Sequence, residues 1–228
     1  MNVKDFKMLQ KKIGVDFNDE NLLTTAFIHR SYLNENSDYS QHNERLEFLG
    51  DAVLELVTTE YLYKNYPNPE GDLTNWRSAL VKTETISDVS KSLGFEDYLF
   101  MSRGESKSKG RARQLILANC FEAVIGAIYM DKGYDEAKKF ITNNLITLLS
   151  EIIEKKLYID PKSRFQELAQ QRESITPRYE VLSEKGPDHN RIFTVGVFVG
   201  EKMIGQGEGA SKQLAQQEAA QNALKSYK

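Results

Sequence analysis

The chain has 228 residues, of which 40% are hydrophobic and 28% charged, and its formal net charge is −3. This composition is typical of a globular protein with one large domain or two ordinary ones. The single cysteine, Cys120, excludes an internal disulfide framework and a cysteine-rich zinc site. The net charge neither supports nor excludes a nucleic-acid partner, because local patches matter more than the total.

The N-terminus, MNVKDFKMLQ, has no apolar core of the kind that defines a signal peptide. No run of residues approaches the roughly 20 apolar positions expected of a membrane span. We therefore expect a cytoplasmic protein without a membrane partner.

Apolar residues recur at helical spacing through residues 1–157, interrupted by YPNPEGDLT at 66–74. Long helices are expected at 18–33, 43–63, 72–94, 115–133 and 134–156. After the linker YIDPK the pattern becomes helix, three strands and helix, with strand alternation clear from Phe193 to Val199. The sequence predicts an all-α domain at 1–157 and a small α+β domain, α-β-β-β-α, at 160–228.

The stretch NERLEFLGDAVLEL, residues 43–56, carries three acids in an otherwise apolar helix. At about 100° per residue, Glu44 and Asp51 lie about 20° apart on the helix and Glu47 about 60° to one side. The only cation within the stretch, Arg45, points elsewhere. A buried carboxylate is costly unless it is paired, protonated or bound to a metal, so these acids call for an explanation.

A second apolar helix, from Leu115 to Met130, has two strongly polar residues, Asn119 and Glu122, which share a face. Packed together, the two helices would gather oxygen ligands that suit Mg²⁺ or Mn²⁺. Paired divalent ions are the usual device for phosphodiester hydrolysis. The same spacing also fits acids that are merely solvated or salt-bridged, and it fits the metal site of a phosphatase or a di-metal oxygenase. The oxygenase is disfavoured, because neither helix has the histidine of the di-iron Glu-x-x-His pattern.

Two further segments have the charge or position of phosphate contacts. The loop SRGESKSKGRAR, residues 102–113, holds five cations against Glu105 and precedes the second acidic helix. Ser211 and Lys212 lie at a predicted helix N-terminus, a natural phosphate-binding position, and His189 lies in the loop GPDHN. The alternative for each segment is an ordinary solvated surface.

Five blocks, in order, resemble bacterial ribonuclease III: LLTTAFIHRSY, NERLEFLGDAVLEL, PEGDLT, SRGESKSKGR and FEAVIGAIYMDKG. Residues 160–228 resemble a double-stranded-RNA-binding domain. The resemblance implies an all-α endonuclease domain that acts as a homodimer on double-stranded RNA. Two composite sites would use Mg²⁺, with Mn²⁺ as a substitute, and leave 5′-phosphate and 3′-hydroxyl ends with a short 3′ overhang. Expected substrates are ribosomal RNA precursors and messenger RNAs.

Motif positions assign roles to individual residues. The resemblance implies that Glu47, Asp51 and Glu122 are catalytic and bind metal together with Asn119. It makes Glu44 and Glu70 supporting acids and places Phe48 at the dimer interface. RNA contacts are expected from the small domain and from the basic loop: Gln166, Glu167, His189, Ser211, Lys212, Arg103, Lys107 and Arg111.

Two departures from the family pattern bear on function. Most members have Asp at the position of Asn119, which keeps a carbonyl oxygen but loses the charge. The segment GASKQLAQQEAA has Ala210, Gln213 and Gln216 where charged residues are commoner, which predicts a weaker duplex contact. Two rival functions are a non-catalytic double-stranded-RNA-binding protein, which Asn119 favours, and a small-molecule phosphohydrolase, which the C-terminal domain and basic loop disfavour.

Overall fold

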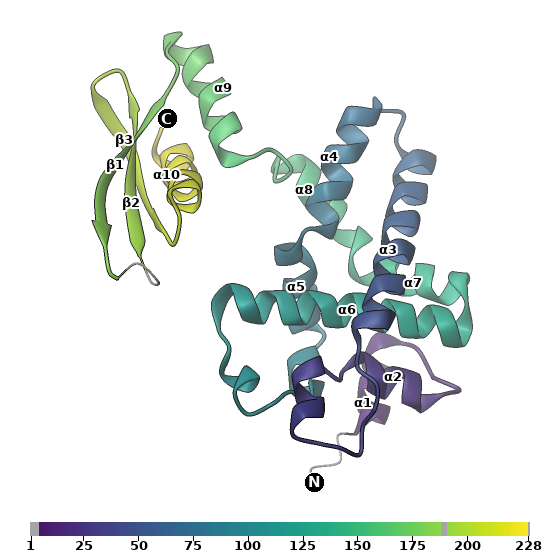
Figure 1. The fold of residues 1–228 in the computed structure, drawn as a ribbon. Helices are drawn as coiled ribbons and strands as arrows, with labels where there is room; N and C mark the ends of the chain where they lie inside the picture. The colour runs from purple at the N-terminus through teal and green to yellow at the C-terminus, as the bar shows by residue number, and fades with distance from the viewer. Residues whose placement is uncertain (1–4, 188–190, 228) are drawn as a thin grey trace. The chain divides into compact units, whose positions relative to one another are not determined.

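The computed structural model describes residues 5–187 and 191–227, and the chain divides into two compact units at Tyr158 and Ile159 (Figure 1). The first unit is helical and the second contains a three-stranded sheet with two helices. This is the fold class expected from the sequence.

The first unit has eight α-helices among its described residues, joined by short 3-10 turns. Aspartates begin the first two helices, because the side chains of Asp5 and Asp19 accept hydrogen bonds from free main-chain N–H groups. The helices are α1 (Phe6–Ile13), α2 (Glu20–Ala26), α3 (Glu44–Asn65), α4 (Glu70–Val81), α5 (Thr83–Ser92), α6 (Gly110–Lys132), α7 (Tyr134–Asn144) and α8 (Leu149–Glu154); the 3-10 turns are η1 (Arg30–Asn34), η2 (Phe95–Tyr98), η3 (Glu105–Lys107) and η4 (Ile146–Leu148).

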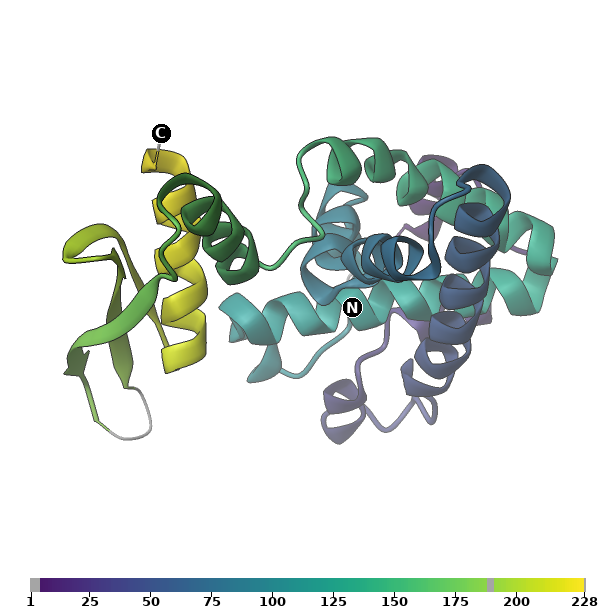
Figure 2. The ribbon, with the colours of Figure 1, turned by 90° about the horizontal axis from the view of Figure 1, so that it is seen from above.

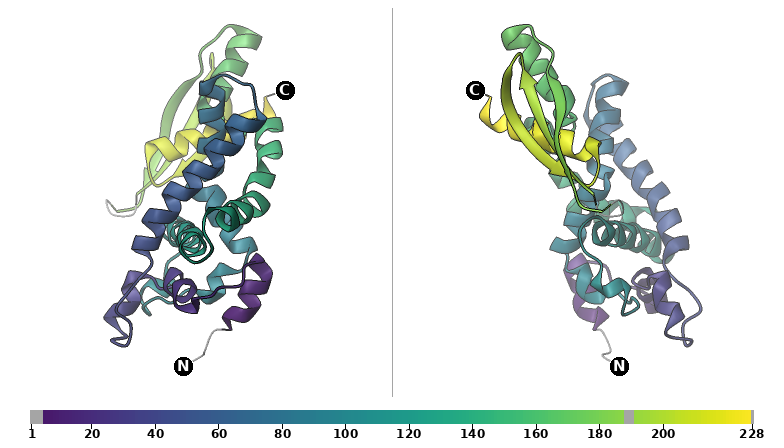
Figure 3. Two further views of the ribbon diagram at one scale, coloured as in Figure 1. Left: turned by 90° about the vertical axis from the view of Figure 1, so that its right-hand side faces the viewer. Right: turned by 60° about the vertical axis from the view of Figure 1, so that its left-hand side comes forward.

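Helix α6 forms the centre of this unit. Figure 2 shows it running lengthwise through the unit, and Figure 3 shows it nearly end-on among its neighbours. It packs against α2, α3, α5 and α7. Its residues Phe121, Val124 and Ile128 are fully buried. Phe121 contacts Phe95 and Phe140, with ring centroids 6.2 and 5.4 Å apart, so the core is continuous across the unit.

The length and composition of α6 alone would allow it to cross a membrane, which corrects the expectation that no run approaches a span. In its most apolar window, however, 61% of the residues are buried inside the unit. Its apolar character is therefore explained by its place at the centre of the helical core.

Three expected helix boundaries were wrong. The predicted helix at 72–94 is broken between α4 and α5 at Lys82, whose ψ of 147° is extended, and the Thr85 hydroxyl donates to the Ala79 carbonyl at 2.9 Å across the break. The predicted helix at 134–156 divides into α7, η4 and α8, and the one at 18–33 ends at Ala26. Helical periodicity alone does not reveal such breaks. At Lys82, the local bond from the Thr85 side chain competes with the hydrogen bonds of a continuous helix.

The second unit has α9 (Pro161–Glu173), strands β1 (Arg178–Lys185), β2 (Ile192–Val199) and β3 (Lys202–Gly209), and α10 (Lys212–Ser226). The strands form an antiparallel sheet in the order β1-β2-β3. Val195 and Val197 of β2 are fully buried beneath the helices, as is Phe165 of α9. On β3, a Cβ at Gly207 would lie 2.2 Å from the main-chain nitrogen of Ala219, so glycine lets α10 lie directly on the sheet.

Candidate active site

Helices α3 and α6 cross in main-chain contact (Figure 1). A Cβ at Gly50 would lie 1.7 Å from the carbonyl oxygen of Glu122, and one at Gly126 would lie 2.2 Å from the carbonyl oxygen of Leu46. Only glycine fits at these positions, because real Cβ atoms do not approach within 3.0 Å. The two glycines therefore fix the separation of the helices that carry the predicted acids.

Four of the predicted side chains meet beside this crossing. The charges of Asp51 and Glu47 act on the carboxyl group of Glu122, and Asn119 forms a hydrogen bond with Glu47. Glu47, Asn119 and Glu122 are partly buried and Asp51 is exposed. The structure thus brings together acids from two helices that lie about 70 positions apart in the sequence.

Two acids of this cluster, Glu122 and Glu47, have raised pKa values. Burial, together with the charges of Asp51 and Glu47, raises the pKa of Glu122 to about 8. Burial, and then the charges of Glu44 and Asp51, raise the pKa of Glu47, whereas the hydrogen bond from Asn119 opposes the change. No cation acts on either carboxyl group in the part of the chain that the structure describes. In the absence of a cation, these carboxyl groups therefore hold protons more tightly than free ones do.

This donor set fits a hard divalent cation by its chemistry. Carboxylate and amide oxygens are the ligands that Mg²⁺ takes, and uncompensated negative charge favours its binding. Among residues 5–187 and 191–227, no group of three or more His, Cys, Asp or Glu side chains is already drawn together tightly enough to hold a metal ion. The three carboxylates would therefore hold the ion together with the Asn119 amide and water, since Mg²⁺ usually keeps several water ligands.

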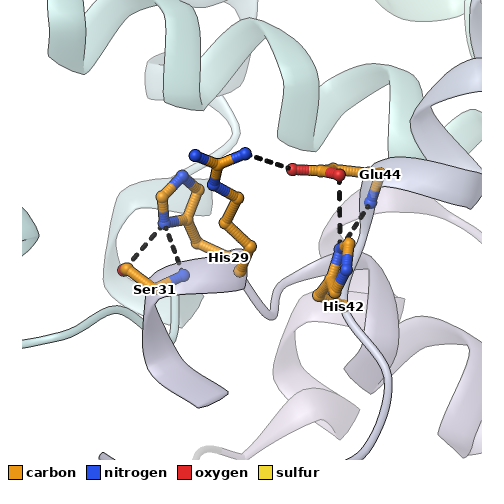
Figure 4. Close-up of polar contacts among 5 residues, drawn as sticks. His29, Ser31, His42 and Glu44 are labelled. Carbon is orange, nitrogen blue, oxygen red and sulfur yellow. Dashed lines mark hydrogen bonds and ion pairs between the residues drawn. The ribbon is translucent and has the colours of Figure 1, made fainter. Parts of the chain in front are cut away.

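Glu44 lies at the first position of α3, next to a different set of contacts. Its carboxylate lies 3.5 Å from the Arg30 guanidinium and 3.9 Å from Nδ1 of His42 (Figure 4). The cation near this acid therefore comes from the preceding segment rather than from Arg45. Glu44 still contributes to the shared field, because its charge acts on Glu47.

Glu70 does not join the other acids within one chain. It begins α4, at the opposite end of α3 from Glu44, and the 22 residues of α3 span about 33 Å. Its side chain is exposed and lines a cavity of about 680 Å³ together with Tyr63, Tyr66 and Arg77.

The three predicted loop cations, Arg103, Lys107 and Arg111, are all exposed. Arg103 is anchored through its main chain, since its N–H donates to both oxygens of Glu35 at 3.2 Å, and its side chain is left to reach outward. Arg113, by contrast, forms an ion pair inside this unit, in which its guanidinium donates to Glu96 at 2.8 Å.

Phe48 is 83% exposed, although it lies in the most apolar part of α3. Leu56 and Tyr63 of the same helix are 57% and 79% exposed. These residues recur at helical spacing, so they form one stripe along α3. The apolar character of residues 43–56 suggests burial on most sides, but the buried residues, which include Val53, Leu54 and Val57, cover only part of the helix.

In the second unit, Gln166 and Glu167 are exposed on α9. The Ser211 hydroxyl caps α10 by accepting from the Leu214 N–H at 3.2 Å. Lys212 lies 3.3 Å from Glu184 and 5.5 Å from the centre of the Phe193 ring. The remaining predicted contact, His189, lies outside the described residues.

Gly50, Gly126 and Arg30 also belong to the site, although the sequence did not predict them. A signal was present for the glycines, because a glycine inside a helix costs up to about 1 kcal/mol relative to alanine and usually has a packing reason. Arg30 gave no comparable signal, since its approach to Glu44 depends on how the intervening loop folds.

Comparison with known proteins gives the same two-part division. The family described as Ribonuclease-III-like matches residues 19–149, and the double-stranded RNA binding motif matches residues 161–227. A protein named Ribonuclease 3 from Streptococcus pneumoniae is 46% identical over 219 residues, which cover 95% of this chain and 94% of that protein.

Solved structures agree for the first unit. Two structures of the nuclease domain of ribonuclease III from Campylobacter jejuni are 39% and 37% identical, with TM-scores of 0.55 and 0.56. They cover 61% and 65% of this chain, and the matches span 98% and 96% of the solved chains. The chain therefore belongs to the ribonuclease III family, as a double-stranded-RNA endonuclease domain followed by a double-stranded-RNA-binding domain.

Proposed function

We propose that this chain hydrolyses phosphodiester bonds in double-stranded RNA with Mg²⁺ bound by Glu47, Asp51, Asn119 and Glu122. The observation that carries the proposal is the convergence of these oxygen ligands beside the crossing of α3 and α6, where no cation among the described residues acts on Glu47 or Glu122. Bound there, Mg²⁺ would supply a more acidic water and electrostatic stabilisation of the transition state, and Mn²⁺ would substitute for it.

The protein side chains would bind and orient the RNA. Glu122 and Glu47, both of raised pKa, would release protons when the metal enters, because metal ligands must be deprotonated. Arg103, Lys107 and Arg111 are exposed and would contact backbone phosphates. In the small domain, Gln166, Glu167 and His189 would contact the minor groove, and Ser211 and Lys212 would contact a phosphate. Such contacts read the shape and 2′-hydroxyls of A-form RNA.

The active species is proposed to be a homodimer joined along α3. The stripe of Phe48, Leu56 and Tyr63 is an exposed apolar surface of the kind that mediates association. In a symmetric dimer with α3 helices antiparallel, Glu70 of one chain would approach the acids of the other, which gives this distant residue a supporting role. Each composite site would cut one strand, and the products would carry 5′-phosphate and 3′-hydroxyl ends with a short 3′ overhang.

We expect this activity in the cytoplasm, on ribosomal RNA precursors and messenger RNAs. The test is incubation of a long perfect RNA duplex with the full chain and Mg²⁺, alongside the matching DNA duplex and single-stranded RNA. Cleavage of the RNA duplex alone, abolished by EDTA and restored by Mg²⁺ or Mn²⁺, is the expected result. The 5′ ends are tested with a polynucleotide kinase, which labels only a 5′-hydroxyl. Products that carry a 5′-phosphate should be labelled only after phosphatase treatment. Cleavage that is insensitive to EDTA, or no cleavage with either metal, would contradict the proposal.

A further inference from the structure

The basic loop that follows Phe100 is held to the segment before α3 by a set of hydrogen bonds. Phe100 pairs with Ile28 in a short parallel bridge, and its carbonyl accepts from the His29 N–H at 3.0 Å. On the other side of this segment, the Ile28 carbonyl accepts from the Asn43 N–H at 2.9 Å, directly before α3. Residues 27–35 thus lie between the loop cations and the helix that carries Glu47 and Asp51.

A serine and a histidine form the polar centre of this junction (Figure 4). Nδ1 of His29 lies 2.8 Å from the Ser31 hydroxyl oxygen and accepts from the Ser31 N–H at 3.3 Å. The Ser31 hydroxyl oxygen also accepts from the N–H of Ser102 at 3.1 Å. Ser102 is the first residue of the basic loop, 71 positions away in the sequence.

The direction of each hydrogen bond can be assigned. Because Nδ1 of His29 accepts a main-chain N–H, it carries no proton, and the Ser31 hydroxyl can donate to it. The hydroxyl oxygen then has lone pairs free for the N–H of Ser102. Burial lowers the pKa of His29, which agrees with the neutral imidazole that this arrangement requires. The side chain of Ser31 therefore joins His29 to Ser102.

The hydrogen bonds continue into the loop. Ser102 accepts from the N–H of Glu105 through its hydroxyl at 3.1 Å and from the N–H of Ser106 through its carbonyl at 2.9 Å. This fixes the turn between Arg103 and Lys107, whose side chains remain exposed. A change at Ser31 would thus reach the loop cations through Ser102 without altering any cation itself.

From these contacts we infer that Ser31 and His29 are positioning residues. They hold the basic loop at a fixed position relative to the acids of α3 during duplex binding. The inference rests on the proposed function, because it assumes that the loop contacts RNA phosphates. Neither residue is assigned a contact with RNA or metal. Their effect is to keep the loop ordered before the duplex arrives, which lowers the entropic cost of binding.

The test compares Ser31→Ala with Ser31→Thr, which retains the hydroxyl, and with Ser37→Ala, an exposed serine of the same connecting segment. Amide hydrogen exchange of the full chain is measured first, without RNA. Ser31→Ala should accelerate exchange at residues 102–106, and the other two variants should match the wild type. This readout does not depend on activity, so it decides whether the junction exists even if the chain cleaves no RNA.

Duplex binding in EDTA and cleavage in Mg²⁺ are then measured as functions of salt. Ser31→Ala should raise KM by about five- to tenfold with kcat within about twofold, and should reduce the salt dependence of binding by about one phosphate contact. Ser31→Thr should restore both values. A merely destabilised protein would instead lose kcat through a smaller active fraction, with KM and the salt dependence unchanged.

Three results would overturn the inference: wild-type exchange at 102–106 in Ser31→Ala, a loss of kcat alone, or a defect that Ser31→Thr does not repair. If the wild type itself neither binds nor cuts duplex RNA, the proposed function is wrong, while the exchange data still report on the junction. His29→Asn provides a second check, because asparagine can accept the Ser31 N–H and is a favourable N-cap residue. His29→Asn should keep wild-type amide exchange at residues 102–106, whereas His29→Ala should accelerate it.

Discussion

The α-carbon of Gly50 faces the carbonyl oxygen of Glu122 so closely that a Cβ there would lie 1.7 Å from it. This contact places an acid-bearing turn of α3 directly against the acid-bearing turn of α6. Because the obstacle is main chain rather than a flexible side chain, a larger residue at position 50 must push the helices apart.

Gly50→Ala is therefore expected to destabilise the first unit and to reduce metal-dependent activity. Overpacking of a tight core typically costs about 1–3 kcal/mol, which lowers Tm by several degrees. Gly71→Ala is the matched control, since it lies in α4 and its Cβ would meet nothing within 4 Å. That change should be neutral or stabilising, by up to about 1 kcal/mol from helix propensity. Equal thermal stability of the Gly50→Ala variant and the wild type would contradict this packing account.

Glu60 of α3 provides a pH-dependent test of stability. It is bonded to Lys138 at 2.8 Å and to Tyr134 of α7, and these bonds together with one from Lys64 lower its pKa to about 2. A carboxyl group of depressed pKa adds stability above the pKa it has when unfolded, and this stability is lost as pH falls through the folded value.

The stabilising effect of Glu60 should therefore be complete above about pH 4.5 and decline toward about pH 2. Glu60→Gln should lower Tm at pH 7, and its difference from the wild type should shrink over that interval. Tyr134→Phe, which removes one of the three hydrogen bonds, should show a smaller loss. Thermal denaturation across the range measures both, and parallel pH profiles for Glu60→Gln and the wild type would refute the assignment.

Phe48 tests the proposed dimer. Phe48→Glu should shift the full chain from dimer toward monomer in sedimentation at micromolar concentration, since it places a charge in the apolar stripe of α3. Met8→Glu is the control, because Met8 is 67% exposed on α1. A wild-type chain that is already monomeric, or a Phe48→Glu variant that stays fully dimeric, would argue against α3 as the interface.

Asn119 tests how much ligand charge matters. The proposed site has three carboxylates and one neutral amide, and hard cations bind more weakly as ligand charge falls. Asn119→Asp should lower the Mg²⁺ concentration needed for half-maximal cleavage. The natural protein should gain more from Mn²⁺ than from Mg²⁺, because Mn²⁺ binds a given site more readily and Mg²⁺ demands near-ideal geometry. Superimposable metal titrations of the natural protein and Asn119→Asp would mean that the charge at position 119 does not affect metal binding.

Local sequence features predicted the acids of the site. Glu47 and Asp51 share a helix face by periodicity alone, and Asn119 and Glu122 do so on a second helix, so their convergence needed only that the helices pack. The alternation in β2 likewise predicted the buried face of the sheet. In each case, the pattern is set by neighbours within one element.

Other features depend on contacts that the spacing of apolar residues does not reveal. The break at Lys82 is supported by the bond from Thr85 to Ala79, and the pairing of Arg30 with Glu44 requires the loop between them to turn back. Glu70 shares a motif block with no other acid of the site, and its position at the far end of α3 is visible only in the folded unit. Periodicity carries no information about such relationships, which explains why sequence reasoning missed them.

Glu122→Gln tests whether the acids on α3 and α6 form one metal-dependent catalytic centre. Glutamine keeps the size of the side chain but removes the only carboxylate between Leu115 and Met130 of α6. Cleavage of a long RNA duplex in Mg²⁺ should fall by roughly a hundredfold or more, while duplex binding in EDTA stays within about twofold. Exposed Glu84→Gln on α5 is the control and should cut like the wild type. Equal cleavage rates for Glu122→Gln and the wild type would contradict the account.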